Sequence, residues 1–254
     1  MELIGISGKI GSGKDTVGTI IQCLMTNGYR QNPKLIAQMI TDNAPILKDI
    51  GTQSGFEIKK FAYKLKQIVA LLTRCTVENL EDQEFKHRLL PEDWNYAISG
   101  MRDRMPISHF KGDIVFEGNP NRFIKKYTYR DLLQQIGTEC MRDGIHQNAW
   151  VNALFADYKG KYNQTESGLR RTDEGLIYPN WIITDCRFPN EAEAINGKGG
   201  ILIRVERAVD GIPSTHPSET SLDNYKFDYV IDNNGSIEEL IEKVAKIINQ
   251  HLSN

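Results

Sequence analysis

The feature that most constrains this chain is a glycine-rich stretch close to its N-terminus. The apolar run LIGIS (residues 3–7) leads directly into GKIGSGKDT (residues 8–16), and apolar residues then recur with helical spacing over residues 16–25. This layout follows the phosphate-loop template G-x-x-x-x-G-K-[ST], which lies between a strand and a helix. The sequence therefore predicts a nucleotide-binding phosphate loop on a strand–loop–helix unit.

The residue types in the stretch suit a polyphosphate. Glycines allow positive φ and a close approach of the backbone, so that successive N–H groups can converge on phosphate oxygens. These groups stand where a helix begins, and its dipole favours an anion there. Lys14 adds a point charge that can follow the β and γ oxygens. The predicted ATP-binding residues are Gly11, Ser12, Gly13, Lys14, Asp15 and Thr16.

One position departs from the template, because Asp15 stands where Ser or Thr would offer a hydroxyl to Mg²⁺. A carboxylate can also hold this ion, directly or through water. The alternative is that Asp15 is only an acidic residue of the first helical turn, favoured by the dipole. We expect Asp15 and Thr16 to act as metal ligands, with Asp185 as a further acid.

Composition excludes some classes of function. The 254 residues, 40% of them hydrophobic, suffice for one large domain or two small ones. Basic and acidic residues number 31 and 33, so no global field favours nucleic acid or an anionic membrane. Neither a signal peptide nor a membrane-spanning run is recognisable, and the four separated cysteines indicate buried, inert thiols rather than a zinc site. We therefore expect a cytoplasmic protein.

Further along the chain, apolar runs indicate strands that alternate with helical segments, as in an α/β fold with a parallel sheet. These runs lie at residues 181–184, 201–205 and 229–231, and residues 56–60 are expected to form a further, brief strand. Two polar, interrupted segments, residues 28–55 and 78–126, are expected to be insertions into a single domain, and residues 205–220 a lid.

The run at residues 181–184 ends in Asp185, with Arg187 and Glu191 behind it. Ligands of open α/β sheets bind beyond the carboxyl ends of the strands, so Asp185 is expected beside the phosphate loop. The alternative is a helix-capping Asp with surface partners. Arg207 follows the run at 201–205 and is a candidate to close over the transferring group.

A helix is expected over residues 128–142, capped by Thr128. Arg130, Gln134 and Gly137 or Thr138 fall three to four residues apart, and such a face suits a phosphate and a base edge. Trp150, in a second helix, could stack on a base, although a buried indole is the commoner role.

Together these residues resemble the phage-type deoxynucleoside monophosphate kinases of the P-loop nucleoside monophosphate kinase superfamily. The pieces that carry the resemblance are the loop with its Gly-Lys-Asp-Thr ending, Arg-x-x-x-Gln-x-x-Gly-Thr from Arg130, Asp-x-Arg-x-x-x-Glu from Asp185, His216 with Glu219, and the turn Asn234-Gly235-Ser236. The resemblance implies a three-layer P-loop kinase fold with a five-stranded parallel sheet and helical or irregular insertions.

The resemblance also implies a reaction: transfer of the γ-phosphate of ATP, with Mg²⁺, to a deoxynucleoside monophosphate. The expected catalytic residues are Lys14, Arg187 and Arg207. The acceptor site is expected to comprise Lys9, Arg130, Gln134, Gly137, Thr138, Trp150, Asp185, Arg187 and Glu191. Small nucleotides would be the partners, with neither nucleic acid nor membrane, and a homodimer is plausible on the resemblance alone.

Two other functions remain open on the sequence. A kinase of another small metabolite, such as dephospho-coenzyme A, would share the fold and a similar C-terminal turn. A nucleotide-dependent switch or motor would also use the loop, but the chain lacks an Asn-Lys-x-Asp motif and an acidic pair after an apolar strand.

Overall fold

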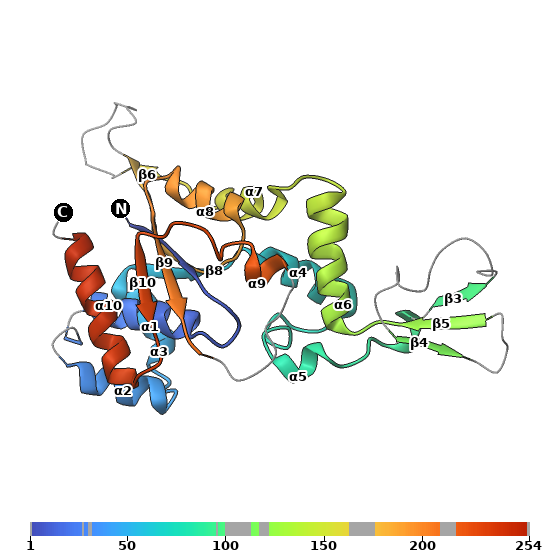
Figure 1. Ribbon diagram of the computed structural model, residues 1–254, viewed down its shortest axis with the longest axis horizontal. Helices are drawn as coiled ribbons and strands as arrows, with labels where there is room; N and C mark the ends of the chain where they lie inside the picture. Colours follow the sequence, from blue (N-terminus) through green and yellow to red (C-terminus); the bar gives the residue numbers. More distant parts are fainter. Residues whose placement is uncertain are drawn as a thin grey trace. The chain divides into compact units, whose positions relative to one another are not determined.

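The structure is a computed structural model, drawn in Figure 1. The residues that it describes are 2–26, 28–29, 32–94, 96–99, 113–116, 122–162, 176–208 and 217–252. The chain forms two compact units. The first comprises Met1–Phe61 and Val151–Asn254, and the second comprises Ala62–Trp150.

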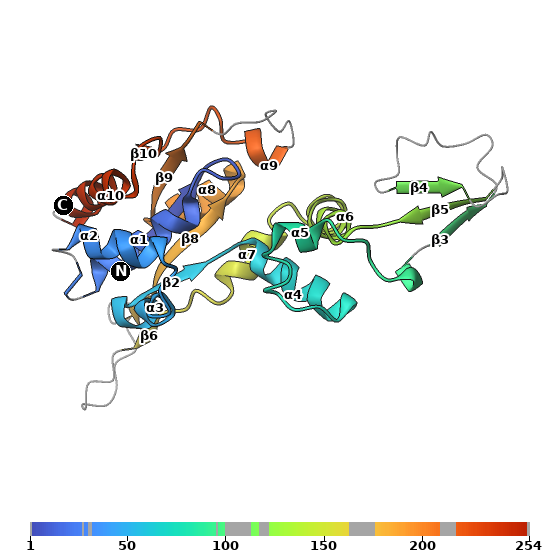
Figure 2. The same ribbon diagram turned by 90° about the horizontal axis from the view of Figure 1, so that it is seen from below.

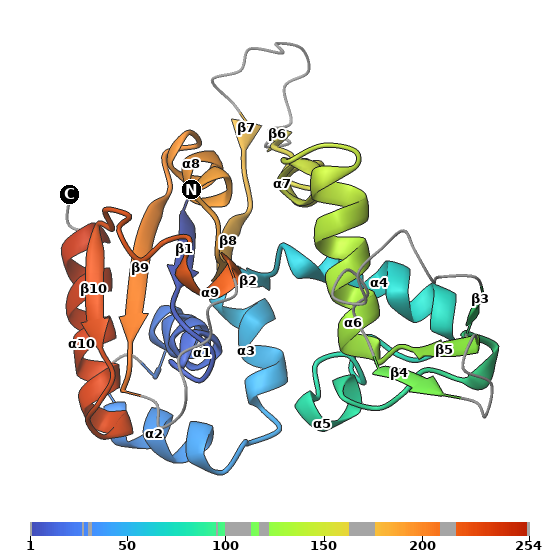
Figure 3. The ribbon, with the colours of Figure 1, turned by 45° about the vertical axis from the view of Figure 1, so that its right-hand side comes forward.

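The first unit is built on a five-stranded sheet in the order β10-β9-β1-β8-β2, in which every pair of neighbours is parallel. Figure 3 shows the strands in this order. Their bounds are β1 (Leu3–Ser7), β2 (Phe56–Lys59), β8 (Asn180–Cys186), β9 (Ile201–Glu206) and β10 (Tyr229–Asp232). Each corresponds to an apolar run of the sequence, and the predicted α/β fold with its five-stranded parallel sheet is confirmed.

Helices cover both faces of this sheet. One layer contains α1 (Lys14–Met25), α2 (Pro33–Thr41), α3 (Leu47–Ser54) and α10 (Ile237–Leu252), which lie together in Figure 2. Successive strand residues alternate between two cores: Ile4 and Ile182 pack with this layer, whereas Leu3 and Ile183 pack with residues of α7 (Ala149–Phe155) and α8 (Pro189–Asn196). Burial of both faces explains why the central strands are continuous apolar runs.

The segment expected as a first insertion is ordered as helices. Asn32 caps α2 by accepting a hydrogen bond from the backbone N–H of Leu35 at 3.2 Å, and Pro33 opens the helix. Ile36 and Ile50 are fully buried in the same core as α1. Residues 33–54 therefore form part of one helical layer of the first unit.

The second unit combines helices with a small antiparallel sheet of order β3-β5-β4. Its elements are α4 (Ala62–Thr73), α5 (Gln83–Lys86), η1 (Glu92–Trp94), β3 (Tyr96–Ser99), β4 (Asp113–Phe116), β5 (Arg122–Lys126), α6 (Tyr129–Gln134) and η3 (Gln135–Asp143). These strands are not predictable from the sequence, because short strands between turn-forming residues leave too few positions for an alternating pattern.

The helix predicted over residues 128–142 changes type part-way. Thr128 caps α6, since its hydroxyl accepts from the Asp131 N–H at 3.1 Å and the Asp131 carboxylate accepts from the Thr128 N–H at 2.9 Å. From Gln135 the helix is a π-helix, with hydrogen bonds between residues i and i+5. Arg130 and Gln134 lie in α6, whereas Gly137 and Thr138 lie in the π-helical part, so the face shared by all four residues stays a prediction.

Three shorter elements complete the first unit: β6 (Lys161–Tyr162), β7 (Leu176–Ile177) and α9 (Pro217–Thr220). Half of the predicted lid, residues 209–216 including His216, lies outside the described residues. Among the helices that the structure describes, none has the length and apolar character needed to cross a bilayer.

We expect the contact of α1 with β8 to tolerate no larger side chain at Gly18. A Cβ on Gly18 would lie 2.8 Å from Cγ2 of Thr184. Gly18→Val should lower the free energy of unfolding by about 1–3 kcal/mol, because it overpacks this contact. Urea unfolding measures the change. The control is Thr19→Val, which places the same side chain on the half-buried neighbouring position of α1; equal stability of the two variants would contradict the prediction.

The cysteines correct one expectation, because only two of the four are buried. Cys23 and Cys186 are buried, Cys75 is partly exposed and Cys140 is exposed. Burial raises the pKa of Cys23 to about 11 and raises that of Cys186 well above its usual value. Iodoacetamide at pH 8 should therefore alkylate Cys140 in the native protein and spare Cys23 and Cys186 until urea unfolds it, as mass spectrometry of peptides would show. Early labelling of Cys186 would contradict this.

Candidate active site

The predicted phosphate loop connects β1 to α1 at the carboxyl end of β1. Gly13 is the N-cap of α1 and has a φ of 95°, a left-handed conformation that glycine adopts without strain. A Cβ on Gly13 would lie 2.6 Å from Nδ2 of Asn233, and this amide donates to the Ser12 carbonyl at 2.8 Å. Asn233 follows β10, so a residue at the end of another strand of the sheet, two positions from β1, binds the loop.

Lys14 is the first residue of α1 and is buried. Its ammonium donates to the carbonyl oxygens of Gly8 and Lys9, both at 2.7 Å. Burial lowers the pKa of Lys14 to about 8, and the charge of Arg187 acts in the same direction. Carboxylates oppose this shift, with Glu219 first among them. Lys14 therefore lies, within the first unit, near one further cation, Arg187, and near several carboxylates, of which Glu219 has the largest effect.

Asp15 makes two specific contacts through one carboxylate oxygen. Its Oδ1 accepts from the hydroxyl of Thr184 at 2.6 Å and lies 3.2 Å from Nζ of Lys60. Burial acts to raise the pKa of Asp15, but the Thr184 hydrogen bond and the Lys60 charge outweigh it, and the pKa is lowered. Thr184 belongs to β8. Its hydroxyl therefore lies beside Asp15, the position at which the phosphate-loop template has a Ser or Thr hydroxyl.

The metal prediction fits this geometry. The side chain of Asp15 is 69% exposed, and its contacts with Thr184 and Lys60 both use Oδ1. No cluster of three or more His, Cys, Asp or Glu residues exists among the described residues. One or two carboxylates with phosphate oxygens and water are the usual surroundings of Mg²⁺ in such sites. Asp15 suits that arrangement, and Thr16 is half-buried in the same helical turn.

Asp185 stands at the carboxyl end of β8, as expected, and its charge reaches Lys14. Its Oδ1 accepts from the backbone N–H of Phe61 at 2.7 Å. Glu191 is buried, and its carboxylate accepts from the N–H groups of Arg187 at 2.7 Å and Phe188 at 3.1 Å. Glu191 therefore fixes the turn that carries Arg187, whereas a direct contact of Glu191 with an acceptor stays a prediction.

Arg187 forms an ion pair with Glu219, whose other oxygen accepts from the backbone N–H of Ile10 at 2.8 Å. Lys9 pairs with Asp223 at 3.6 Å. Arg207 is exposed beyond β9. Arg204, within β9, is buried and donates to Ser7 and Asp223 at 3.2 and 2.9 Å.

The other predicted acceptor residues lie in the second unit. Arg130, Gln134 and Thr138 are partly exposed, whereas Gly137 is buried beside Leu65. Trp150 is 7% exposed, and its indole N–H donates to the Gly137 carbonyl at 2.8 Å. The indole is thus buried and hydrogen-bonded within the second unit, as a structural tryptophan commonly is; stacking on a base is the other role expected from the sequence. An acceptor site that combines residues of both units stays a prediction.

Sequence reasoning assigned no site role to four residues that contact the phosphate loop or its charges: Lys60, Thr184, Glu219 and Asn233. Each lies far from the phosphate loop in the sequence. The feature that could have pointed to three of them is their position at the end of a strand. Lys60 directly follows β2, Thr184 lies near the end of β8, and Asn233 directly follows β10. Their positions at the carboxyl edge of a parallel sheet are a usable hint.

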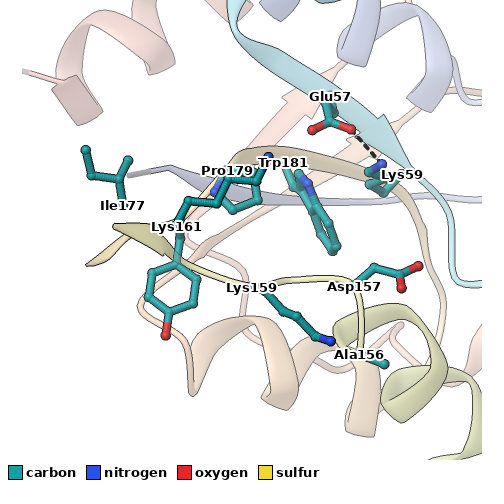
Figure 4. Close-up of a pocket in the computed structure, with 10 residues that line it drawn as sticks. Glu57, Lys59, Ala156, Asp157, Lys159, Lys161, Ile177, Pro179 and Trp181 are labelled. Carbon is teal, nitrogen blue, oxygen red and sulfur yellow. Dashed lines mark ion pairs between the residues drawn. The ribbon is translucent and has the colours of Figure 1, made fainter. Parts of the chain in front are cut away.

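A cavity of about 670 Å³ lies elsewhere in the first unit. Figure 4 shows its lining, which includes Trp181, the ion pair of Glu57 with Lys59 at 2.7 Å, Lys159 and Lys161. None of the predicted nucleotide-binding residues lines it. The candidate site is therefore identified by the loop and its charges and not by this hollow.

We expect the hydrogen bond from Thr184 to stabilise the charged form of Asp15. Thr184→Val should lower the free energy of unfolding at pH 7 by about 1 kcal/mol, since exposure of Asp15 weakens a charge-assisted bond, and Thr184→Ser should restore most of it. The pKa of Asp15 is lowered in the fold. The difference between the Val variant and the wild type is therefore present above the unfolded pKa of about 3.9 and lost as the pH falls through the folded pKa. Urea unfolding over a series of pH values from 7 downward measures it; a loss that does not shrink as the pH falls would contradict the explanation.

Comparisons with known proteins identify the family of this chain. A family model described as deoxynucleotide monophosphate kinase matches residues 59–244, more than half of the 254 residues. The deoxynucleotide monophosphate kinase of Enterobacteria phage T4 is 31% identical over 128 residues, which cover 50% of this chain and 48% of that protein. A protein of Acanthamoeba polyphaga mimivirus is 30% identical over 129 residues, which cover 48% of this chain and 61% of the relative.

The chain thus spans about half the length of these two relatives. The deoxynucleotide monophosphate kinase of Escherichia phage RB69 aligns end to end, at 24% identity over 259 residues that cover 98% of this chain and 100% of that protein. The family expected from the sequence is confirmed. This chain, with its strand–loop–helix site around Lys14, belongs to the deoxynucleotide monophosphate kinase family.

Proposed function

We propose that this protein transfers the γ-phosphate of ATP to a deoxynucleoside monophosphate and so forms a deoxynucleoside diphosphate. The observation that carries the proposal is the loop between β1 and α1, with the Lys14 ammonium bound to its carbonyls. The family match supports the proposal independently, because residues 59–244 exclude the loop. The names of the relatives supply the acceptor class.

In the proposed reaction, an oxygen of the acceptor phosphate forms a bond to the γ-phosphorus as the bond to the β–γ bridging oxygen breaks. No general base is required, because the acceptor phosphate is already an anion. The protein's task is to position the groups and stabilise charge. The N–H groups of residues 11–16 would bind the donor phosphates, and Lys14 would neutralise their β and γ oxygens.

Asp15 and Thr16, with help from Asp185, would hold Mg²⁺, which neutralises phosphate charge when bound. Arg187 would hold the acceptor phosphate from the first unit and Arg130 from the second. Arg207 would approach the transferring group, where spread charge on the equatorial oxygens favours a guanidinium. Six further residues would form the acceptor site, by direct contact with the acceptor or by packing against residues that contact it: Lys9, Gln134, Gly137, Thr138, Trp150 and Glu191.

Small nucleotides are the partners in this proposal. The near balance of 31 basic and 33 acidic residues supports small molecules over nucleic acid. ATP and Mg²⁺ as proposed reactants are consistent with a cytoplasmic location. A homodimer is part of the same hypothesis, and light scattering of the purified protein would test it.

We expect the purified protein to convert deoxynucleoside monophosphates to diphosphates when incubated with ATP and Mg²⁺. Separate reactions with each common ribo- and deoxyribonucleoside monophosphate, followed by chromatography of the products, would define the acceptor range. Lys14→Ala should lower turnover by about 10²-fold or more, because it removes a charge from the transferring phosphates. Its stability should change little, since the desolvation cost of a buried ammonium is removed with its hydrogen bonds.

The matched control is Lys226→Ala, which removes an exposed lysine of the same unit. Its turnover should equal that of the wild type. ATP binding without transfer to any nucleotide would overturn the proposed function and favour a metabolite kinase or a switch. Unfolding of Lys14→Ala would overturn the assigned role of Lys14.

A further inference from the structure

Glu219 is a buried carboxylate that joins two phosphate-site elements. Its side chain is 5% exposed and belongs to α9. One oxygen accepts from the backbone N–H of Ile10 in the phosphate loop at 2.8 Å, and the other accepts from a guanidinium nitrogen of Arg187. Both oxygens of Glu219 are therefore used inside the protein.

The two partners of Glu219 come from different strand ends. Ile10 belongs to the loop after β1, and Arg187 follows β8. The backbone of Arg187 is fixed separately, because its N–H donates to the Glu191 carboxylate at 2.7 Å. Glu219 thus binds the guanidinium of Arg187 while its other oxygen binds the backbone of the phosphate loop.

Charge also favours a carboxylate at this place. Arg187 lies close enough to Lys14 to lower its pKa, and Glu219 lies close enough to raise it. Two cations that both serve phosphates repel each other when no phosphate lies between them. The anionic Glu219 offsets this repulsion while leaving both cations in the site.

We propose that Glu219 is a positioning residue for phosphoryl transfer, which fixes the guanidinium of Arg187 relative to the phosphate loop. This proposal rests on the proposed function. An arginine already held in place loses less freedom when an acceptor phosphate binds. Glu219 acts through Arg187 and Ile10 and touches no substrate.

The chemistry of the side chain makes the proposal specific to Glu. A carboxylate can accept from both donors at once, whereas an amide has a single acceptor oxygen. In Glu219→Gln, either the Ile10 N–H or the guanidinium therefore faces an NH₂ group and loses its acceptor. Glu219→Asp keeps the charge but is one methylene too short to reach both partners.

A double-mutant cycle tests whether Glu219 acts through Arg187. We expect Glu219→Gln to lower kcat by about 10- to 100-fold, with KM for ATP nearly unchanged, because a misplaced group costs about this much. Arg187→Met should lower kcat at least as far, and the double variant should resemble Arg187→Met alone. Losses that multiply in the double variant, or full activity of Arg187→Met, would overturn the proposal.

Asp223→Asn is the matched comparison. Asp223 follows α9 closely and pairs with Lys9 at 3.6 Å and Arg204 at 2.9 Å, but the structure gives it no contact with Arg187. Any loss caused by Asp223→Asn should therefore multiply with that of Arg187→Met. If Glu219→Gln fails to fold, Glu219→Asp takes its place in the cycle with the same expected kcat loss and coupling.

Hydrogen exchange separates this proposal from the proposed function. The Ile10 N–H should exchange faster in Glu219→Ala, which removes both acceptor oxygens, than in the wild type or in Asp223→Asn, as mass spectrometry of peptides covering residues 8–13 would show. Unchanged exchange would overturn the bridge whatever the activity. A wild type without kinase activity would overturn the proposed function, while faster exchange in Glu219→Ala would still establish the bridge.

Discussion

The burial of the Lys14 ammonium is the constraint on which the site depends. A buried cation is costly unless it is hydrogen-bonded, and the carbonyls of Gly8 and Lys9 bond it at 2.7 Å. The chain changes direction at Gly13, the N-cap of α1, whose φ of 95° is left-handed. This turn lets the Lys14 ammonium reach the two carbonyls. Strand, loop and helix are therefore fixed together, and the same turn directs the first N–H groups of α1 outward to an anion.

The other charges of the first unit are held by contacts that cross between elements. Thr184 of β8 orients Asp15 of α1, the Phe61 N–H binds Asp185, and the Ile10 N–H binds Glu219. Each carboxylate is thus fixed by a group from a different segment of the chain. Such mutual fixation reduces the reorganisation needed when a charged ligand binds, which is how enzyme sites stabilise charge at low cost.

Much of the fold was predictable where a local pattern is strong. Five apolar runs became the five strands, and Ser236 caps α10 by accepting from the Glu239 N–H at 3.2 Å. The antiparallel sheet was missed, because its short strands lie between turn formers. The π-helix was missed because its hydrogen-bond pattern leaves no signal in apolar spacing. Of the site, the loop was predictable, but its partners Lys60, Thr184, Glu219 and Asn233 were not.

The sequence by itself determined the phosphate loop, the parallel α/β class and the family, because each rests on residues close together in the chain or on a pattern with one period. Only the tertiary structure decided which charges meet. Thr184 lies 169 residues from Asp15, and Glu219 lies 209 residues from Ile10. These residues meet because parallel strands bring their carboxyl ends to one edge of the sheet. The order of the strands decides which loops are neighbours there, and local sequence patterns do not encode that order.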